Sequence, residues 1–450
     1  MQQQQNILFE DHSFGRLQPL ALSTPTYEIR CGMFNTRERL QLVTAGQGGL
    51  ALCREILRHL HAAPDWSCEA GNPAERTLWL NGRLAPDADL VARLHSLRGE
   101  DWALTDEQGL LAAALNPSLS ALLLASWQSW EAEAWAPVAW ELPAEITALK
   151  SPELGAEYGA VELGWIWDLV PATSRALAAD LKLAVGSGPM ERHPFGLITA
   201  EAAAWSRPGS LRLVDSDASP AQVHISGDGG LYLGSGGVEI APGTHIDTSA
   251  GAVVLDSGVR VMAHAYLAGP LYIGRDSIVK PGARIFGESS FGVGNRLAGE
   301  IGESTFGDFA NKQHDGFVGH AVLGSWINLG AMTTCSDLKN NYGPVRVDLG
   351  AGLQDTGQRF VGLMLGDHAK TAIGSVFNTG TAVGFASNIF GGGMPPKFVP
   401  NFSWGGQDAA PTYDEARARQ TGQVVLERRG CLWTEAHARL FAFLHARASG

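Results

Sequence analysis

Apolar residues recur at every sixth position in the second half of the chain. Counting in sixes from Leu255 reaches Leu297 without a polar residue, and the position four residues after each is usually small. Neither a helix, with a period of 3.6, nor an ordinary strand, with a period of 2, gives this pattern. A six-residue repeat predicts a parallel β-helix, in which the apolar residue fills the axis and the small one fits the bend. The apolar positions are Leu255, Val261, Leu267, Ile273, Val279, Ile285, Phe291 and Leu297, and the small ones include Ala265, Ser277, Ala283 and Ser289.

Insertions displace the repeat, which then resumes. A Pro-Gly break at 207–209 begins the passage to this region, and Pro395-Pro396 with the stretch 401–406 ends it. The pattern therefore predicts a β-helix domain over residues 206–400. The later positions expected to point inward are Phe317, Leu323, Leu329, Ile373, Val383 and Ile389.

The first 205 residues alternate strand-like and helical runs. We expect strands at 6–11 and 78–80, a helix that begins at Arg37 with Thr36 as its cap, and a helix over 90–97. This alternation predicts a mixed α/β domain over residues 1–205. We interpret the tryptophans that follow as core packing rather than as a ligand platform. They are Trp127, Trp130, Trp135 and Trp140.

Two helices are expected after the repeat. Thr412 and Glu415 have the spacing of a capping box that opens the first, and residues 434–448 predict the second, with Leu440 on its inward face. We expect both to pack against the end of the β-helix and to cover its edge. These helices form a predicted cap over residues 401–450.

The net charge of −13, without any run of Lys or Arg, argues against binding to nucleic acid or to an anionic membrane surface. No apolar run reaches transmembrane length, and the N-terminal residues lack the basic-then-apolar pattern of a signal peptide. Five scattered cysteines are typical of reduced thiols. We therefore expect a cytoplasmic protein. The length of 450 residues is enough for two or three hydrophobic cores.

Polar residues interrupt the repeat between Asn311 and Gly343, where a regular coil could have continued. His314 is suited to accept a proton near neutral pH, and Lys312 can hold a phosphate. Asn and Tyr side chains of this run can hold a polyhydroxylated substrate. The alternative is that all are solvated corner residues of a solenoid, and the residues alone leave both interpretations open.

The same run resembles the acetyltransferase half of the bifunctional bacterial UDP-N-acetylglucosamine pyrophosphorylase/glucosamine-1-phosphate N-acetyltransferase family. From about Asn6 to Gly406 the chain is similar to the divergent GlmU-like branch of that family, most specifically at 311–343, 377–380 and 401–406. His314 and Asn328 keep the family's spacing of fourteen residues. The resemblance implies that His314 is the general base that prepares a substrate amine for attack on the acetyl thioester.

Other residues take implied roles from the same resemblance. Asn328, Asn341 and Tyr342 match positions that contact the amino sugar, and Lys280 lies where the family has an Arg that binds the uridyl or phosphate group. The family's coenzyme A cleft is lined by the region of Gly374 and Ser375, which implies acetyl-CoA as the co-substrate. Two positions depart from the family, because Gly302 replaces its second basic residue and Phe317 replaces a Tyr.

The N-terminal half departs further from a pyrophosphorylase. The Gly-rich loop whose N–H groups cradle phosphates is missing from 12–20, and Ser23-Thr24-Pro25 stands where the branch carries Thr-Arg-Pro. Matches elsewhere make Arg30 and Arg83 candidate phosphate binders and Asp168 a candidate ligand for Mg²⁺. The alternative is that these three residues are structural.

A three-histidine zinc site between subunits is a further interpretation, with His314, His320 and His368 as its ligands. Neighbouring hexads lie on different sides of the coil, so His314 and His320 should point apart. We therefore favour the acyltransferase interpretation.

Together these observations predict an α/β nucleotidyltransferase-like, Rossmann-like domain followed by a left-handed parallel β-helix with C-terminal helices. We expect an enzyme that transfers the acyl group of acetyl-CoA to the amine of a sugar phosphate or nucleotide sugar. The alternatives are sugar-1-phosphate nucleotidyl transfer by the N-terminal domain, with the β-helix for assembly, and a non-catalytic scaffold that binds a nucleotide sugar. In each case we expect a homotrimer, because coils of this kind have flat, largely apolar sides.

Overall fold

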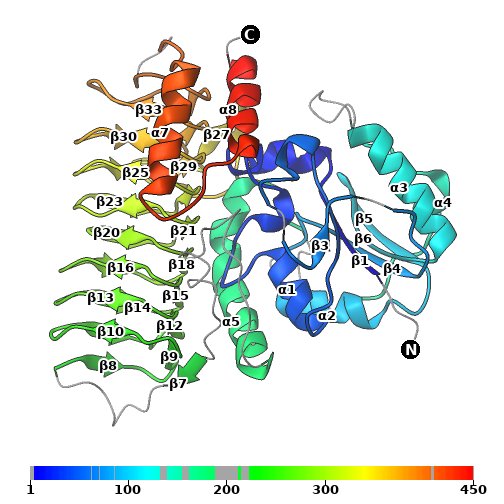
Figure 1. Ribbon diagram of the computed structural model, residues 1–450. Helices are drawn as coiled ribbons and strands as arrows, with labels where there is room; N and C mark the ends of the chain where they lie inside the picture. Colours follow the sequence, from blue (N-terminus) through cyan, green and yellow to red (C-terminus); the bar gives the residue numbers. More distant parts are fainter. Residues whose placement is uncertain are drawn as a thin grey trace.

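The computed structural model describes residues 5–61, 63–69, 71–85, 87–131, 139–154, 162–187, 211–213, 222–406 and 410–448. An α/β domain lies beside a long coil of short strands; of the two C-terminal helices, one lies along the coil and the other between the coil and the α/β domain (Figure 1). In these residues no helix is long and apolar enough to cross a membrane.

The N-terminal domain is built on a six-stranded sheet with the strand order β3-β2-β1-β4-β6-β5. The first four strands in this order are parallel, and β6 and β5 complete the sheet antiparallel. The central strand buries Ile7, Leu8 and Phe9 completely, as expected for the predicted strand at 6–11. The strands are β1 (Gln5–Phe9), β2 (Gly49–Leu52), β3 (Trp66–Ser67), β4 (Thr77–Asn81), β5 (Trp102–Asp106) and β6 (Gly109–Leu115).

Helices cover this sheet, and the predicted ones are present. The first is capped by Asn35 rather than Thr36: its side chain accepts from the N–H of Glu38 at 2.8 Å, and Glu38 bonds back to the N–H of Asn35. Trp127, Trp130 and Trp140 are buried in the core, as predicted, and Trp135 lies outside the described residues. The α-helices are α1 (Thr36–Val43), α2 (Ala88–Ser96), α3 (Pro117–Glu131), α4 (Ala144–Thr147) and α5 (Leu169–Ser187). The short 3₁₀ helices are η1 (His12–Leu17), η2 (Leu20–Leu22), η3 (Thr26–Glu28), η4 (Glu55–Leu57) and η6 (Ile166–Asp168).

The coil is a parallel β-helix with three sides, which we name A, B and C in the order in which the chain crosses them after β8. Side A consists of β9 (Leu231–Gly234), β12 (Val253–Leu255), β15 (Leu271–Ile273), β18 (Ser289–Phe291), β21 (Thr305–Phe306), β24 (Val322–Leu323), β29 (Met364–Leu365), β32 (Ala382–Val383) and β34 (Phe398–Val399), with β7 (Leu211–Leu213) antiparallel at one end. Side B consists of β10 (Glu239–Ile240), β13 (Arg260–Val261), β16 (Ile278–Val279), β19 (Arg296–Leu297), β22 (Asn311–Lys312), β25 (Asn328–Leu329), β30 (Lys370–Thr371) and β33 (Asn388–Ile389). Side C consists of β8 (His224–Ser226), β11 (His245–Asp247), β14 (Tyr266–Ala268), β17 (Arg284–Ile285), β20 (Glu300–Gly302) and β23 (Phe317–Gly319), and the pair β26 (Thr334–Cys335) and β31 (Val376–Phe377) follows it. The domain boundary predicted between residues 205 and 206 lies outside the described residues.

The hexad pattern predicts the axis of this coil correctly in its regular part. All eight residues counted from Leu255 to Leu297 are at most 2% exposed, and Leu323, Leu329, Val383 and Ile389 are buried as well. Two later predictions are wrong. Phe317 is half-buried while Val318 fills the axis, and Ile373 is 80% exposed while Thr371 and Phe377 are buried.

A short corner explains the first error, and a count resumed out of phase explains the second. The corner between β16 and β17 contains four residues, whereas the corner between β19 and β20 contains only Ala298 and Gly299, and that between β23 and β24 only His320 and Ala321. The axis residue before Leu323 is therefore Val318, five positions earlier. From Leu365 to Ile389 the axis residues keep the spacing of six, and Ile373 lies off it, in the corner 372–375. An insertion then interrupts the coil: Val322 pairs with Met364, while in the regular part Val253 pairs with Leu271. This insertion carries an antiparallel hairpin of β27 (Arg346–Asp348) and β28 (Leu353–Asp355).

Side A is covered by the N-terminal domain. Helix α5 runs along it, and the hydroxyls of Thr173 and Thr305 lie 3.1 Å apart across the interface. The loop after β1 also docks there, since the hydroxyl of Ser23 donates to Asp367 at 2.8 Å. The α/β domain and the β-helix therefore share a buried apolar interface.

The C-terminal helices α7 (Glu415–Glu427) and α8 (Glu435–Ala448) do not cover the end of the coil as expected. Leu426, at the end of α7, packs against Phe309 and Trp326 along the edge between sides A and B. Phe441 of α8 contacts Phe385 between the coil and the α/β domain (Figure 1). The cap of α7 is Asp414, two residues after the predicted Thr412, because its carboxylate accepts from the N–H of Arg417 at 2.9 Å.

Two isoleucines test which residues fill the axis. We expect Ile273→Ala, at a fully buried position, to lower the free energy of unfolding by about 2–5 kcal/mol, because it leaves a cavity. Ile373→Ala, at a position 80% exposed, should change it by less than about 0.5 kcal/mol. Urea denaturation followed by circular dichroism measures both, and similar losses for the two variants would contradict this arrangement.

Candidate functional site

The edge between sides B and C carries His314. The residue lies in the corner 313–316 between β22 and β23, and its side chain and that of Asp315 are exposed. In the next coils, the N–H of Met332 donates to the carbonyl of Asp315 and the N–H of Gly374 donates to that of Ala331, both at 2.8 Å. Backbone hydrogen bonds therefore stack His314 and Gly374 along one edge, with one coil between them.

Three more predicted residues lie on or beside this edge. Lys280 begins the corner after β16, and Ser375 ends the corner after β30. Asn328 is exposed at the start of β25 on side B. Lys280 therefore lies two coils before His314 and Ser375 two coils after it, along the same edge.

Asn341 and Tyr342 are placed elsewhere. Both are exposed in the insertion, which leaves the coil between sides C and A. Tyr342 is 68% exposed, and the amide oxygen of Asn341 accepts from the N–H of Gly343 at 3.1 Å. Within one chain, these two residues belong to the opposite edge of side C from His314.

Lys312 points into the coil rather than toward a substrate. It pairs with Leu297 in the row of axis-filling residues and is 2% exposed. Its ammonium donates to the carbonyl of Ala298 at 3.1 Å and also to the carbonyl of His314. A Cβ on Gly299 would lie 2.8 Å from the ammonium nitrogen, so the short glycine corner makes room for it. The prediction of Lys312 as a substrate contact is wrong in this structure, where Lys312 instead holds the turn that carries His314.

A histidine with an oriented ring lies at the edge between sides C and A. Nδ1 of His320 lies 2.8 Å from the carboxylate of Asp337 and 3.9 Å from that of Glu303. Its ring stacks on Phe360, with 4.8 Å between the ring centroids. An aspartate on Nδ1 fixes the tautomer and leaves Nε2 as the proton acceptor, which is the geometry of a general base.

The insertion builds this arrangement. Asp337 and Phe360 stand at its two ends, which are joined where Leu338 bridges to Phe360. Burial raises the pKa of the Glu303 carboxyl, while the nearby His320 opposes that shift. The sequence analysis missed Asp337 and Phe360 as partners of His320, although the interruption of the repeat between 335 and 363 was a signal for them.

The two candidate phosphate binders of the N-terminal domain are held by carboxylates. Arg83 is 1% exposed and makes two bonds of 2.5 Å to Asp106. Arg30 donates to Glu38 at 3.2 Å and to the carbonyl of Met33 at 2.6 Å. Both guanidinium groups therefore serve the structure of the domain, which favours the structural alternative for these residues.

Asp168 has a similar local role. One carboxylate oxygen accepts from the N–H of Trp165 at 2.8 Å and the other from the amide of Gln358 at 3.2 Å, and burial raises the pKa of this carboxyl. Among the described residues no group of three or more His, Cys, Asp or Glu side chains could hold a metal ion. The donor set around Asp168 in this part of the chain does not fit Mg²⁺.

Within one chain, the three histidines of the zinc interpretation lie apart. His314 lies on the edge between sides B and C, His320 on the edge between C and A, and His368 on the edge between A and B, where it is buried. Three different edges of one coil cannot bring these imidazoles to one metal ion.

The buried amine of Lys312 should make stability depend on pH. Burial lowers its pKa from 10.5 to about 8, so between these values the unfolded chain binds more protons and stability rises with pH. We expect Lys312→Met to lose that rise. From pH 8 to pH 10.5, the unfolding free energy of the wild type minus that of the variant should rise by about 1–3 kcal/mol. Denaturation at several pH values measures it, with Lys280→Met as the control, and a difference that does not change with pH would refute it.

Comparisons with known proteins agree with the α/β domain. Residues 6–187 match the model of a family described as sugar nucleotidyl transferase. The bifunctional protein GlmU of Prochlorococcus marinus (strain MIT 9313) is 29% identical over 168 residues, which are 37% of this chain and 32% of that protein. The match thus spans about a third of that relative.

A solved structure of a Bacillus cereus protein described as an acetyltransferase covers 50% of this chain and 97% of its own, with 9% identity and a TM-score of 0.19. A likeness this low carries no argument about fold or function. This chain is similar to sugar nucleotidyl transferases over residues 6–187 and, distantly, to GlmU over 168 residues.

Proposed function

We propose that the protein is an enzyme of the divergent GlmU-like branch and that its β-helix, left-handed in winding, transfers an acyl group. The donor is acetyl-CoA, and the acceptor is the amine of a sugar phosphate or nucleotide sugar. A base takes a proton from the nitrogen, and the nitrogen attacks the thioester carbonyl. The C–S bond then breaks, the amide forms, and the departing thiolate takes up a proton from the protonated base to leave as the coenzyme thiol. Backbone N–H groups at a coil corner stabilise the oxyanion that forms between these steps.

One observation carries this proposal: His314, Asn328 and Gly374 lie together on an exposed part of the coil. The corner of His314 is held from inside by Lys312, so the imidazole stands on a fixed turn. Prearranged groups of this kind lower the cost of reaching a transition state. The apolar side chains of Met332 and Ile373, 57% and 80% exposed on the same edge, support assembly of three copies around it.

Two histidines compete for the role of base. The family's spacing of fourteen residues to Asn328 favours His314 as the base. The carboxylate of Asp337 orients the ring of His320, which favours His320 instead. We assign the role to His314, because it shares its edge with Gly374 and Ser375, the residues matched to the coenzyme A cleft. His320 then serves as an internal comparison on the opposite edge of side C.

The family match favours a second candidate function, sugar-1-phosphate nucleotidyl transfer by the N-terminal domain. Against it stand the missing Gly-rich loop and the two arginines engaged by Asp106 and Glu38. Phosphoryl chemistry needs prearranged donors around the phosphates, and these side chains do not supply them. A third candidate, a non-catalytic scaffold that binds a nucleotide sugar, needs neither base nor thioester.

We expect weak or absent nucleotidyl transfer. Release of pyrophosphate from common nucleoside triphosphates and sugar 1-phosphates, measured with Mg²⁺ present, should stay near the background rate. A GlmU assayed in parallel gives the positive control. Robust release by this protein that Asp168→Asn reduces would assign the activity to the N-terminal domain and overturn this expectation.

We expect His314→Ala to lower acyl transfer at least about a hundredfold, which is typical for loss of a general base. Amino sugar 1-phosphates with acetyl-CoA are the substrates, and mass spectrometry together with release of coenzyme thiol measures turnover. The melting temperature and the trimer mass from light scattering should stay unchanged.

His320→Ala is the matched control and should lose much less activity. Equal losses would refute His314 as the base, and a greater loss in His320→Ala would move the role to the pair of His320 and Asp337. A monomer mass for the wild type would contradict the proposed trimer.

A further inference from the structure

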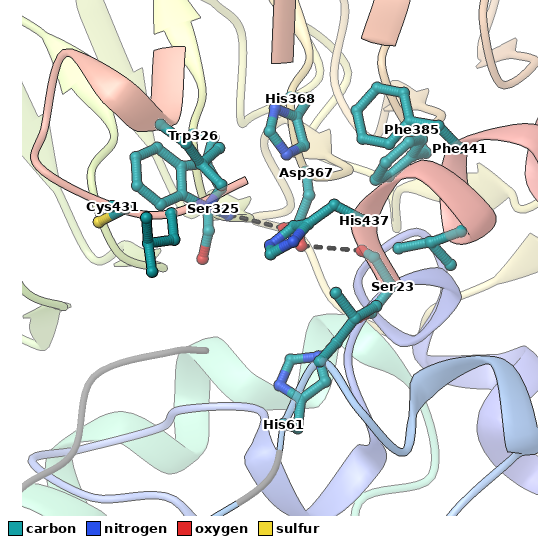
Figure 2. A pocket seen from close by; sticks show the side chains of 14 residues that line it. Ser23, His61, Ser325, Trp326, Asp367, His368, Phe385, Cys431, His437 and Phe441 are labelled. Atoms are coloured by element: carbon teal, nitrogen blue, oxygen red, sulfur yellow. Dashed lines mark hydrogen bonds between the residues drawn. The ribbon is translucent and has the colours of Figure 1, made fainter. Parts of the chain in front are cut away.

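A hollow lies where the three parts of the protein meet. Ser23 and His61 come from the α/β domain, Trp326 and His368 from the coil edge between sides A and B, and His437 from α8. Figure 2 shows these side chains around a common space. A cleft between separate parts of a protein is a common place for a small-molecule site.

Two polar groups on its wall are fixed in orientation. Asp367 accepts from the N–H of Ser325 at 2.7 Å and from the hydroxyl of Ser23 at 2.8 Å. Nδ1 of His437 lies 3.1 Å from the N–H of Thr434 and 2.8 Å from its hydroxyl. Because the N–H can only donate, Nδ1 of His437 is the acceptor, and the proton of the neutral ring is on Nε2, which is a hydrogen-bond donor.

His368 supplies an unsatisfied group on the same wall. The residue is 5% exposed, and its Nδ1 is buried with no hydrogen-bond partner among the described residues. A buried nitrogen without a partner destabilises a fold, so native structures rarely keep one. A bound molecule with a polar edge would satisfy this nitrogen.

The charge state and the aromatic lining of the hollow indicate what kind of molecule fits it. Burial lowers the pKa of His61 and His437 to about 4, so both imidazoles are neutral near pH 7 and offer no cation to an anionic ligand. The carboxylate of Asp367 is already engaged by Ser325 and Ser23. No group of three or more metal-ligating side chains in the described chain could hold a metal ion. Trp326, Phe385 and Phe441 line the hollow with flat apolar rings. These walls suit an uncharged, planar molecule.

We propose that this hollow binds a small uncharged heteroaromatic molecule, such as a nucleobase or the base of a nucleoside. Nε2 of His437 donates to a ring nitrogen or carbonyl, and Nδ1 of His368 bonds to the polar edge. Because the wall comes from three separate parts of the chain, the ligand fastens the α/β domain and α8 to the coil. Occupancy therefore stabilises the folded protein by mass action.

The test uses the full chain at pH 7.5 with uracil, cytosine, adenine and hypoxanthine at millimolar concentration. At least one of them should raise the melting temperature by about 2 °C or more, and isothermal titration calorimetry should give one site per chain. Sodium acetate and inorganic phosphate serve as charged probes and should give no shift. A shift from neither the four bases nor their nucleosides overturns the proposal.

Variants locate the site. His368→Leu removes Nδ1 without leaving a cavity, and it should weaken binding at least tenfold, whereas His59→Leu, an exposed histidine beside the wall residue Leu60, should leave it unchanged. His437→Phe keeps a ring and removes the donor, so it provides a second variant if the first does not fold. Unchanged affinity in a folded His368→Leu or His437→Phe protein would place binding elsewhere and overturn the proposal.

Discussion

The structure depends on filling the axis of the coil while consecutive coils stay in hydrogen-bonded register. Val253 and Leu271 pair side by side because one regular coil separates them, and the same register continues along side A. This pairing places residues that are one coil apart in a row on the outer surface. Chemistry on the surface of this protein is therefore ordered by the repeat, as the stack from His314 to Gly374 illustrates.

Lys312 is the informative exception to an apolar axis. A buried amine is costly unless its hydrogen bonds are made, and here the carbonyls of Ala298 and His314 make them. The two-residue corner at Ala298 and Gly299 leaves the room. One irregular coil thus joins three features: a shortened corner, a polar residue in the axis and the turn that carries the candidate base.

Several charged residues of the N-terminal domain form ion pairs buried inside the domain. Glu10 with Arg54 and Asp180 with Arg39 form fully buried ion pairs at 2.7 and 2.8 Å. Breaking such a pair would leave a buried charge without a partner, so these residues are fixed in place. Because the loop after β1 also docks on the coil through Ser23, the segment that would cradle a phosphate in a pyrophosphorylase acts as an interface here.

The sequence alone determined the coil, the buried residues of its regular part, the first strand and the helices α1, α2, α7 and α8, because all of these follow from spacings within a short stretch of chain. It also singled out His314 and Gly374, which the stacking of coils brings to one edge. It did not show at which residue the count of six resumes after the insertion, so it placed Ile373 inward although this residue lies in a corner. The sequence also could not show that Arg83 is paired with Asp106 or that the ends of the insertion enclose His320. It could not show that α7 and α8 lie along the coil either. Those outcomes depend on contacts between residues far apart in the chain, as with Ser23 and Asp367, and only the packing of the two domains brings such residues together.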